Sequence, residues 1–423
     1  MLQIGFLREN KTEAIGRLSK RMENAEDAVE KVLALDASRR NIQTQLDNTA
    51  AELNTLSKEI GILFKSGQIE KANLSKLKTT DLKNQKANLT QALNRNSKDL
   101  QQLLYQLPNL PHDSVPIGNS ENENIEVFSS GIIPELHSAA LPHWELAKKY
   151  DIIDFELGNK ISGAGFPVYK GKGARLQRAL INYFLDLNIA AGYNEVQLPH
   201  LVNEASGIGT GQLPDKEGQM YFINADKLYL IPTGEVPATN IFREVILKAE
   251  ALPKQITTYT PCFRREAGSY GADVRGLNRL HQYDKVEILR IEHPNESYNA
   301  LHGMVEHIKT ILEALQLPYR ILKLCSGDLG FTSALTYDFE IFSPAQEKWL
   351  EVSSVSNFET FQSNRLKIRY RDNHGNIDLV HTLNGSALAL PRVLAAILEN
   401  YQSDDGIKVP KVLQKYTGFS IIK

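Results

Sequence analysis

Four arginines and several carboxylates gather in the stretch from Thr260 to Glu287, TPCFRREAGSYGADVRGLNRLHQYDKVE. Arginine carries a planar, permanently charged fork that matches phosphate geometry better than lysine does. A purely electrostatic phosphate site has no use for the acids Glu266 and Glu287 in the same stretch. We therefore predict a ligand that carries both phosphates and amino groups. The four arginines are Arg264, Arg265, Arg275 and Arg279.

Alternating polar and apolar residues predict that this stretch is a β-hairpin. PCFRRE and LHQYDKVEIL read as half-buried strands, and AGSYGADVRG between them holds three glycines and no helical stripe. Arg264 and Glu266 would then share one face of the first strand. Tyr283, Lys285 and Glu287 would share one face of the second. A solvated, charged hairpin would show the same alternation, and this is the alternative interpretation.

Further motifs in the chain match one known family. FRREAG and RLHQYDKVE resemble motif 2 of the class II aminoacyl-tRNA synthetases, and IPTGEVPATN resembles the serine-specific TxE loop. WLEVSSVSNFETFQSNR resembles the strand before motif 3, and TLNGSALALPRVLAAILENYQ resembles motif 3 itself. With HWELAKKYDIIDF and a helical arm, the resemblance to bacterial-type seryl-tRNA synthetases covers essentially the whole chain. It implies an α+β fold: a class II antiparallel sheet flanked by helices, with an N-terminal antiparallel two-helix coiled-coil arm.

Length and composition allow this fold. With 423 residues, of which 42% are hydrophobic, the chain suits two or three domains. We expect a tRNA-binding arm over 1–110, a linker and lead-in segment over 111–170, and a catalytic domain over 171–423. No apolar run approaches the roughly 18 to 20 residues of a membrane span, so we expect a cytoplasmic protein without a membrane partner. Cys262 and Cys325 have no CxxC neighbour, so we expect reduced thiols and no zinc site.

A seven-residue apolar repeat runs from about Ala28 to Leu107 and breaks near Gly67, which predicts one chain folding back on itself as an antiparallel coiled coil. Between Lys58 and Lys86, seven lysines stand against three acids. Charge alone favours an ordinary solvated surface. The resemblance instead implies that this arm grips tRNA-Ser, with lysines along the RNA backbone. The candidate tRNA-binding residues are Lys71, Lys76, Lys78 and Lys83.

The resemblance implies ATP and L-serine as substrates and a homodimer built on motif 1, which matches the helix Gly173 to Leu187 and the strand YNEVQLPHLV. The serine carboxylate would attack the α-phosphorus of ATP, and Arg264 would hold both groups. Arg392 would hold the γ-phosphate and Arg279 the β/γ end. Arg275 would either assist there or stabilise the motif 2 loop, and the sequence favours neither role.

Adenine needs a flat partner and an edge reader. The resemblance implies stacking on Tyr283 and hydrogen bonding to Glu266, helped by the backbone of Arg265 and Leu280. An ordinary core aromatic is the alternative for Tyr283. Magnesium needs oxygen ligands, usually one or two carboxylates with phosphates and water. The pair implied here is Glu351 and Ser354, and Val352 and Ser353 would lie along the nucleotide.

Serine is small, so specificity must come from reading its ammonium and hydroxyl groups. The resemblance assigns the ammonium to Thr233, Gly234 and Glu235 in the TxE loop. It assigns the hydroxyl and the closure of the pocket to Glu287, Asn384 and Ser386. The chain departs from many relatives at Gly234, Arg265 and Pro391, which affects loop geometry and removes no group with a chemical role.

We therefore predict an enzyme, a serine–tRNA ligase that forms seryl-adenylate and transfers serine to the 3′ end of tRNA-Ser. Whether the tRNA for selenocysteine is also a substrate stays open. A ligase that loads an amino acid onto a carrier protein is one alternative, although such relatives lack the long arm. A catalytically silent RNA-binding paralogue is the other, and it would be expected to lose Arg264, Glu351 or Arg392, all of which are present.

Overall fold

The computed structural model describes residues 1–215, 218–266 and 275–423. The chain divides into two compact units. One unit spans Leu2–Pro108, and the other spans Asn109–Lys423 together with Met1. Within the described ranges, no helix combines the length and the apolar character needed to cross a membrane.

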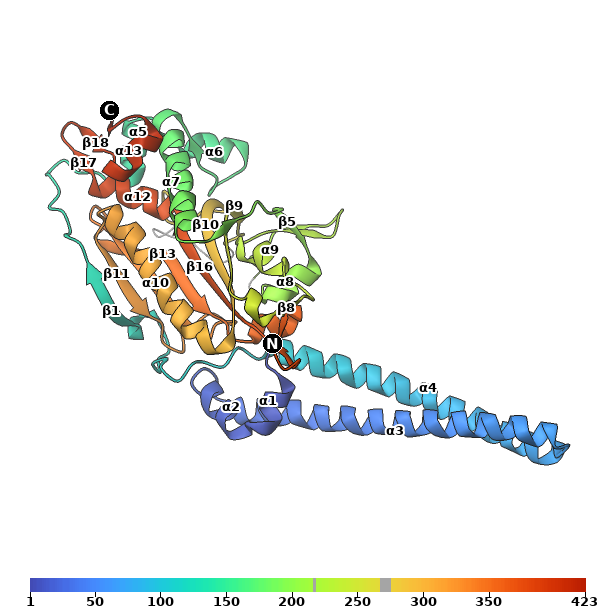
Figure 1. Ribbon diagram of the computed structural model, residues 1–423. Helices are drawn as coiled ribbons and strands as arrows, with labels where there is room; N and C mark the ends of the chain where they lie inside the picture. Colours follow the sequence, from blue (N-terminus) through green and yellow to red (C-terminus); the bar gives the residue numbers. More distant parts are fainter. Residues whose placement is uncertain (216–217, 267–274) are drawn as a thin grey trace. The chain divides into compact units, whose positions relative to one another are not determined.

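The unit Leu2–Pro108 is helical, and its two long helices lie side by side in opposite directions (Figure 1). They are joined at Gly67, whose φ of +75° falls in the left-handed region that glycine adopts without steric cost. This confirms the predicted antiparallel hairpin and its turn. The helices of this unit are α1 (Ile4–Glu9), α2 (Lys11–Leu18), α3 (Ala25–Lys65) and α4 (Ile69–Gln106).

The seam between α3 and α4 follows the predicted heptads, with Val32, Leu56, Leu82 and Leu100 buried. Thr49, which interrupts the apolar repeat, is also buried. Its hydroxyl donates to the carbonyl of Gln45 at 2.8 Å, so the helix itself satisfies this polar group. The short helices α1 and α2 pack against the beginning of α3.

The second unit is built on an eight-stranded sheet, antiparallel except where β4 runs parallel to β9. This order confirms the predicted α+β class. Across the sheet the strands are β1 (Ile125–Ser130), β11 (Tyr319–Lys323), β12 (Leu335–Ser343), β13 (Lys348–Asn357), β16 (His381–Ala389), β10 (Gln282–Glu292), β9 (Lys254–Phe263) and β4 (Asn194–Glu195).

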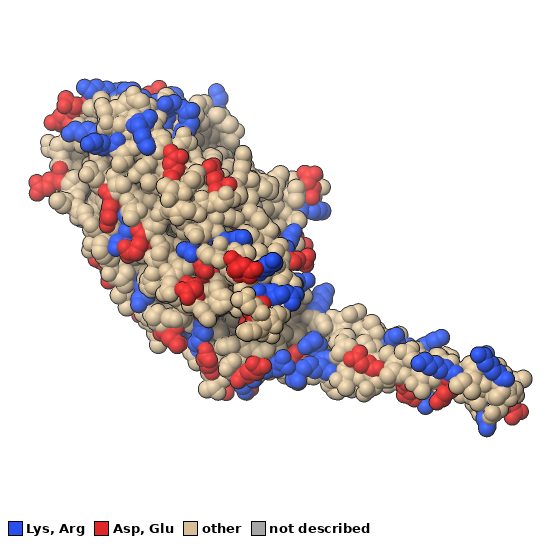
Figure 2. All heavy atoms as spheres, in the orientation of Figure 1, with Lys and Arg blue, Asp and Glu red and all other residues tan. Residues whose placement is uncertain are grey.

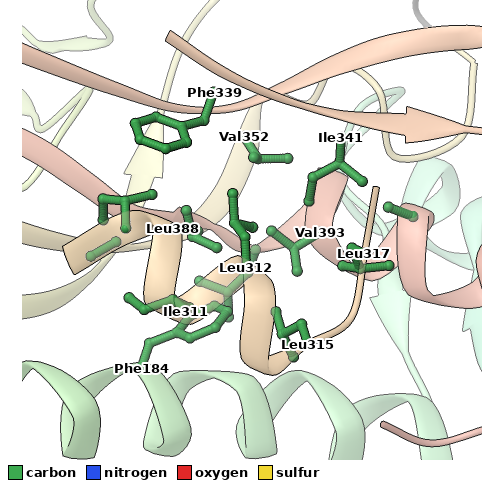
Figure 3. Close-up of a cluster of buried hydrophobic side chains, with 14 of the residues drawn as sticks. Phe184, Ile311, Leu312, Leu315, Leu317, Phe339, Ile341, Val352, Leu388 and Val393 are labelled. Atoms are coloured by element: carbon green, nitrogen blue, oxygen red, sulfur yellow. The ribbon is translucent and has the colours of Figure 1, made fainter. Parts of the chain in front are cut away.

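The longest helices that pack on this sheet are α7 (Gly171–Ala190), α10 (Ser297–Ala314) and α12 (Leu390–Asn400). Figure 3 shows their apolar side chains meeting those of the strands in one core cluster. Each large aliphatic or aromatic side chain buried in this cluster stabilises the folded protein by about 1.5–3 kcal/mol. The cluster includes Phe184 of α7, Ile311 and Leu312 of α10, Phe339 of β12, Val352 of β13, Leu388 of β16 and Val393 of α12.

Shorter elements surround this core. The helices are α5 (His143–Lys149), α6 (Phe155–Ile161), α8 (Glu204–Thr210), α9 (Glu235–Asn240), α11 (Phe361–Leu366) and α13 (Gln414–Thr417). The strands are β2 (Ile153–Asp154), β3 (Val168–Tyr169), β5 (Leu201–Asn203), β6 (Phe222–Ile223), β7 (Leu228–Leu230), β8 (Ile246–Lys248), β14 (Arg369–Arg371), β15 (Ile377–Leu379), β17 (Gln402–Ser403), β18 (Gly406–Lys408) and β19 (Ile421–Ile422). The strand expected over YNEVQLPHLV is two short strands, β4 and β5, with Pro199 between them, which has no N–H for a ladder.

The predicted hairpin is formed by β9 and β10, which pair from Phe263 opposite Gln282 back to Lys254 opposite Ile291. One detail of the prediction is wrong: β9 ends at Phe263, so Arg264 and Glu266 do not alternate along it. The chain turns away because the Arg265 N–H donates to the carbonyl of Gln219 at 2.8 Å. Of the expected turn AGSYGADVRG, residues 267–274 lie outside the described part of the chain.

Candidate active site

Two adjoining cavities open beside β10, β13 and β16, with volumes of about 490 and 880 Å³. Each is within the size range of small-molecule sites. We call them the first and the second cavity. They share part of their lining, so a ligand in one would lie against a ligand in the other. The shared residues are Gln212, Arg264, Lys285, Glu351 and Ser386.

The cavities collect most of the predicted site residues. The first is lined by Arg264, Glu266, Arg279, Leu280, Tyr283, Glu351, Val352, Ser353 and Arg392. The second is lined by Thr233, Glu235, Ser354, Asn384 and Ser386, with Arg264 and Glu351 again. Four residues predicted for the substrate site line neither cavity: Arg265, Gly234, Glu287 and Arg275.

Arg264 lies at the junction of the two cavities, and its neighbours fix its side chain. The guanidinium carbon is 5.4 Å from the centroid of the Tyr283 ring, which is cation–π geometry. The Nε–H of Arg264 donates to the carbonyl of Pro232 at 3.4 Å, and the Tyr283 hydroxyl donates to the same oxygen at 2.8 Å. An arginine fork is thereby aimed at the junction before any ligand arrives.

Two further arginines line the first cavity. The Nη1 of Arg279 is 3.4 Å from a carboxylate oxygen of Glu266. Arg392, in the first turn of α12, donates from Nε to the carbonyl of Asn278 at 3.0 Å and from Nη1 to the carbonyl of Glu351 at 2.7 Å. Both guanidinium groups are therefore held by neutral or acidic partners at the wall of the cavity.

Arg275 lies apart from these three arginines and lines neither cavity. Its guanidinium carbon is 4.8 Å from the centroid of a Trp144 ring, and its Nη2 is 3.6 Å from a carboxylate oxygen of Glu145. Both partners belong to α5. Of the two roles that the sequence left open, this position favours stabilisation of the loop.

The side chain of Glu287 is only 1% exposed, and it contacts residues that line the cavities. It accepts a hydrogen bond of 2.5 Å from the Thr233 hydroxyl and one of 2.8 Å from the Asn384 amide. It also forms an ion pair with Lys285. Burial alone lowers the pKa of Lys285, but Glu287 outweighs it and raises that pKa above its ordinary value. The lysine is therefore charged and faces both cavities.

Glu235 begins α9, and its carboxylate accepts a hydrogen bond of 2.5 Å from the amide of Gln362. Burial raises the pKa of Glu235 to about 7, against the opposing effect of that hydrogen bond. The preceding residue, Gly234, is tightly packed. A Cβ there would be 3.0 Å from Oγ1 of Thr260 and 3.2 Å from Cγ of Glu287, so glycine suits this close approach.

A β-bulge in β13 brings Glu351 and Ser354 to one face of the sheet. Residues three apart on a regular strand point to opposite faces. Here Ser353 pairs with Phe339 and Glu351 with Glu340, so Val352 is the extra residue. Ser354, opposite Asp338, then shares a face with Glu351.

Family models match both units of the chain. Residues 1–111 match the seryl-tRNA synthetase N-terminal domain, and residues 221–401 match the tRNA synthetase class II core domain (G, H, P, S and T). A serine–tRNA ligase of Salinibacter ruber is 50% identical over 398 residues, which cover 94% of this chain and 93% of that protein. The chain belongs to the seryl-tRNA synthetase family. A serine–tRNA ligase of Chlorobium chlorochromatii is 46% identical over 430 residues, with both chains fully covered.

A solved structure agrees with this membership. The crystal structure of seryl-tRNA synthetase from Pyrococcus horikoshii complexed with ATP superimposes with a TM-score of 0.92 at 33% identity, covering 100% of this chain and 99% of that one. The predicted class II fold with its helical arm is confirmed. The seryl-tRNA synthetase family consists of ATP-using class II ligases that join serine to tRNA, so this chain is an enzyme of that class. Neither a carrier-protein ligase nor a silent paralogue finds support among these matches.

Several residues of the site were missed in the sequence. Lys285 was placed on the hairpin face, but it was given no role, although it lines both cavities. The charged pair Lys285 and Glu287, two apart on one strand, was the available signal. Gln362 and Asn278 gave no signal, because their partners Glu235 and Arg392 are more than a hundred residues away in the chain.

Proposed function

We propose that the two cavities bind ATP and L-serine side by side, so that serine is activated to seryl-adenylate and then transferred to tRNA-Ser. The observation that carries this proposal is the position of Arg264 in the lining of both cavities. A single cation at such a junction contacts the carboxylate nucleophile and the α-phosphate electrophile at once. It aligns the two groups and neutralises the charge that develops in the transition state.

In this proposal the first cavity holds ATP. Arg392 and Arg279 bind the β- and γ-phosphates, since both line that cavity and carry permanent positive charge. Tyr283 stacks with adenine through its ring, while its hydroxyl stays bonded to the Pro232 carbonyl. Glu266 accepts a hydrogen bond from the adenine amino group, with backbone groups of Arg265 and Leu280 alongside. Val352 and Ser353 follow the nucleotide along β13.

The residues near Glu351 fit a magnesium ion that accompanies ATP. The bulge puts the carboxylate of Glu351 and the hydroxyl of Ser354 on one face, beside Asp338. Oδ1 of Asp338 is buried and has no hydrogen-bond partner in the described part of the chain. Mg²⁺ takes one or two carboxylates with phosphates and water, which this pair matches. The bound ion would supply positive charge to the phosphates of ATP.

The second cavity holds serine in this proposal. Glu235 and the TxE loop residues Thr233 and Gly234 take the ammonium group. Asn384 and Ser386, which line this cavity, take the side-chain hydroxyl, and Glu287 holds Thr233 and Asn384 by hydrogen bonds. A polar pocket of this kind rejects analogues that lack the hydroxyl, because they leave buried polar groups unpaired.

The helical unit, assigned to residues 1–110, is the proposed tRNA-binding arm, ahead of a lead-in over 111–170 and a catalytic domain over 171–423. Figure 2 shows lysine and arginine side chains interspersed with acids along the visible face of α3 and α4. Lys71, Lys76, Lys78 and Lys83 are exposed. Lys78 also pairs with Glu52 at 2.8 Å. Exposed lysines suit the phosphate backbone of RNA.

A homodimer formed through the motif 1 elements α7 and β4 completes the proposal. β4 is an outermost strand of the sheet, and both of its residues are exposed. Light scattering coupled to size-exclusion chromatography tests this part, with twice the 47.4 kDa chain mass as the expected result.

The decisive experiment is ATP–pyrophosphate exchange without tRNA. Serine should support exchange, and alanine, which lacks the hydroxyl, should support it poorly. Exchange that is independent of serine, or equally supported by both amino acids, would refute the assignment of the second cavity. Charging of tRNA-Ser transcripts then tests the transfer step.

A further inference from the structure

A buried polar network lies behind the first cavity and joins His143 of α5 to Glu399 of α12. Both side chains are completely buried, and neither lines the first or the second cavity. Nδ1 of His143 is 2.8 Å from Oε1 of Glu399, and the backbone N–H of His143 donates to the same oxygen at 2.9 Å. On the opposite edge of the ring, Nε2 accepts a hydrogen bond of 2.8 Å from the backbone N–H of Leu277.

These contacts fix the protonation state of His143. A backbone N–H can only donate, so Nε2 must present its lone pair to Leu277. The ring proton then lies on Nδ1 and points at Glu399, which makes the imidazole neutral in one defined tautomer. Burial raises the pKa of Glu399, but hydrogen bonds from His143 and the Ser343 hydroxyl outweigh it, and the net shift is downward. An ionised Glu399 keeps the imidazole in this orientation.

The chain next to Leu277 is fitted closely to the imidazole ring. Gly276 has a φ of +67°, in the left-handed region. A Cβ on Gly276 would be 2.3 Å from Nε2 of His143. Any larger residue would therefore push the backbone off the ring.

The same network continues to the wall of the first cavity. The Asn278 amide donates to the side-chain carbonyl of Gln346 at 2.8 Å, and the Gln346 amide donates to Glu399 at 3.0 Å. The backbone carbonyl of Asn278 in turn accepts the 3.0 Å hydrogen bond from Nε of Arg392. Leu277 and Asn278 are thus held by the network on one side and hold Arg392 on the other. Arg279 is the next residue along.

We propose that His143 is a positioning residue for the nucleotide half of the reaction. As a neutral Nδ1–H imidazole it fixes the backbone of Leu277 and Asn278, and through that backbone it aims Arg392 and Arg279 at the phosphates. It does not touch ATP or serine. This inference rests on the proposed binding of ATP in the first cavity.

Three substitutions of His143 separate positioning from packing. His143→Gln places an amide oxygen where Nε2 stood and keeps an acceptor for Leu277. His143→Asn reaches only the Nδ1 position, and His143→Leu keeps neither contact. Losing the acceptor should raise the Michaelis constant for ATP in pyrophosphate exchange about tenfold in the Asn and Leu variants, with the Gln variant within about threefold of wild type. The Michaelis constant for serine should change much less in all three.

Two further variants make the test independent of folding. Gln346 lies in a partly exposed turn, so the Gln346→Ala protein should fold. The substitution removes the hydrogen bond to Asn278 and should again raise the Michaelis constant for ATP selectively. His307→Leu is the matched control. This histidine of α10 is hydrogen-bonded to Asn188 at 2.7 Å and has no hydrogen bond to the residues around Leu277 in the described part of the chain. Its loss should lower the melting temperature without a selective rise in the Michaelis constant for ATP.

Equal rises in the Michaelis constants for ATP and for serine would overturn the proposal. So would a His143→Gln protein whose Michaelis constant for ATP is as high as that of the His143→Leu protein. An unchanged constant for ATP in folded His143→Asn and Gln346→Ala proteins would do the same. Absence of serine-dependent exchange in the wild-type protein is a different result, because it would refute the proposed function itself.

Discussion

The guanidinium carbon of Arg264 lies 5.4 Å from the ring centroid of Tyr283, and the two side chains donate to one carbonyl oxygen, that of Pro232. An arginine at the junction of two ligand cavities is thereby oriented by an aromatic face and a backbone acceptor. The same arginine lines both cavities. Preorganised donors of this kind lower a barrier without further reorganisation of the protein.

Arg264→Ala should lower the rate of serine-dependent pyrophosphate exchange by at least about 10² to 10³ fold, or about 3 to 4 kcal/mol by analogy with a lost oxyanion donor. Arg264→Lys should recover only part of this, because a point charge cannot bridge two anions as a planar fork does. Tyr283→Phe is the matched control, because it keeps the ring and loses one hydrogen bond. It should raise the activation free energy of exchange by only about 1 kcal/mol. Near-normal exchange in a folded Arg264→Ala protein would rule out the assigned role.

Glu287→Gln should weaken both serine use and stability. The carboxylate accepts from Thr233 and Asn384 and neutralises Lys285, so an amide in its place leaves a buried lysine unpaired and sets one N–H₂ against a donor. Breaking a buried ion pair from one side typically costs about 3–5 kcal/mol. Thermal unfolding and the Michaelis constant for serine are the measurements.

The double variant Lys285→Met with Glu287→Gln is the control for that cost. It should recover much of the lost melting temperature, since no unpaired charge remains, but not the activity. A rise in the Michaelis constant for ATP with that for serine unchanged would show that Glu287 serves the other substrate.

Local patterns predicted the scaffold well. The heptads that end at Gly67 and the alternation on both sides of the hairpin are short-range signals, because each reflects one buried face of one element. The same reasoning failed at Arg264 and Glu266. Strand periodicity gives no sign of the hydrogen bond from the Arg265 N–H to the Gln219 carbonyl, and β9 ends before that bond forms.

The parts of the site that depend on long-range contacts were not predictable from pattern. Period-two alternation puts Glu351 and Ser354 on opposite faces, and only the extra residue Val352 brings them together. His143 belongs to the predicted lead-in segment and was given no role there. Its partners Leu277 and Glu399 are more than a hundred residues away along the chain, so no local signal links them.

Serine binding should depend on pH through Glu235, whose pKa burial raises to about 7. Only the ionised carboxylate attracts an ammonium group, so the Michaelis constant for serine should be level above about pH 8 and rise roughly tenfold for each pH unit well below 7. Glu235→Gln should raise that constant and abolish its pH dependence between pH 5.5 and 7.5. A wild-type constant that is flat across this range would contradict the assignment.

The same group makes a prediction about stability. The folded pKa of Glu235 is about 7 against an ordinary value of 4.5, so the folded protein binds this proton more tightly than the unfolded chain does. Its contribution to the free energy of unfolding is therefore greatest below pH 4.5, is lost as pH rises toward 7, and amounts to about 3 kcal/mol. Glu235→Gln should consequently be more stable than wild type at pH 8. Denaturant titrations of both proteins at pH 6 and pH 8 measure the difference.

Removing the helical unit should separate the two steps of the reaction. The cavities are lined only by residues of the other unit, so deletion of Leu2–Pro108 should leave serine-dependent exchange largely intact and abolish efficient charging of tRNA. Deleting only Ala28–Leu107 is a poorer choice, because Leu7 and Leu18 of α1 and α2 are buried and would be exposed. Loss of exchange in a folded deletion protein would show that the arm also supports activation.

Replacing Lys71, Lys76, Lys78 and Lys83 with alanine tests the arm in the full chain. All four are exposed, so the fold should tolerate the change. Each phosphate contact releases counterions, so affinity for tRNA should fall, and the slope of log affinity against log salt should flatten by up to about 3. Lys78, already paired with Glu52, should contribute less than Lys71 or Lys83 when each is replaced alone.

A matched control removes the same charge from the exposed Lys248, Lys408, Lys411 and Lys415 outside the arm. Equal losses in both quadruple variants would mean that net charge alone governs binding. Unchanged affinity and salt slope in the arm variant would mean that its lysines form an ordinary solvated surface.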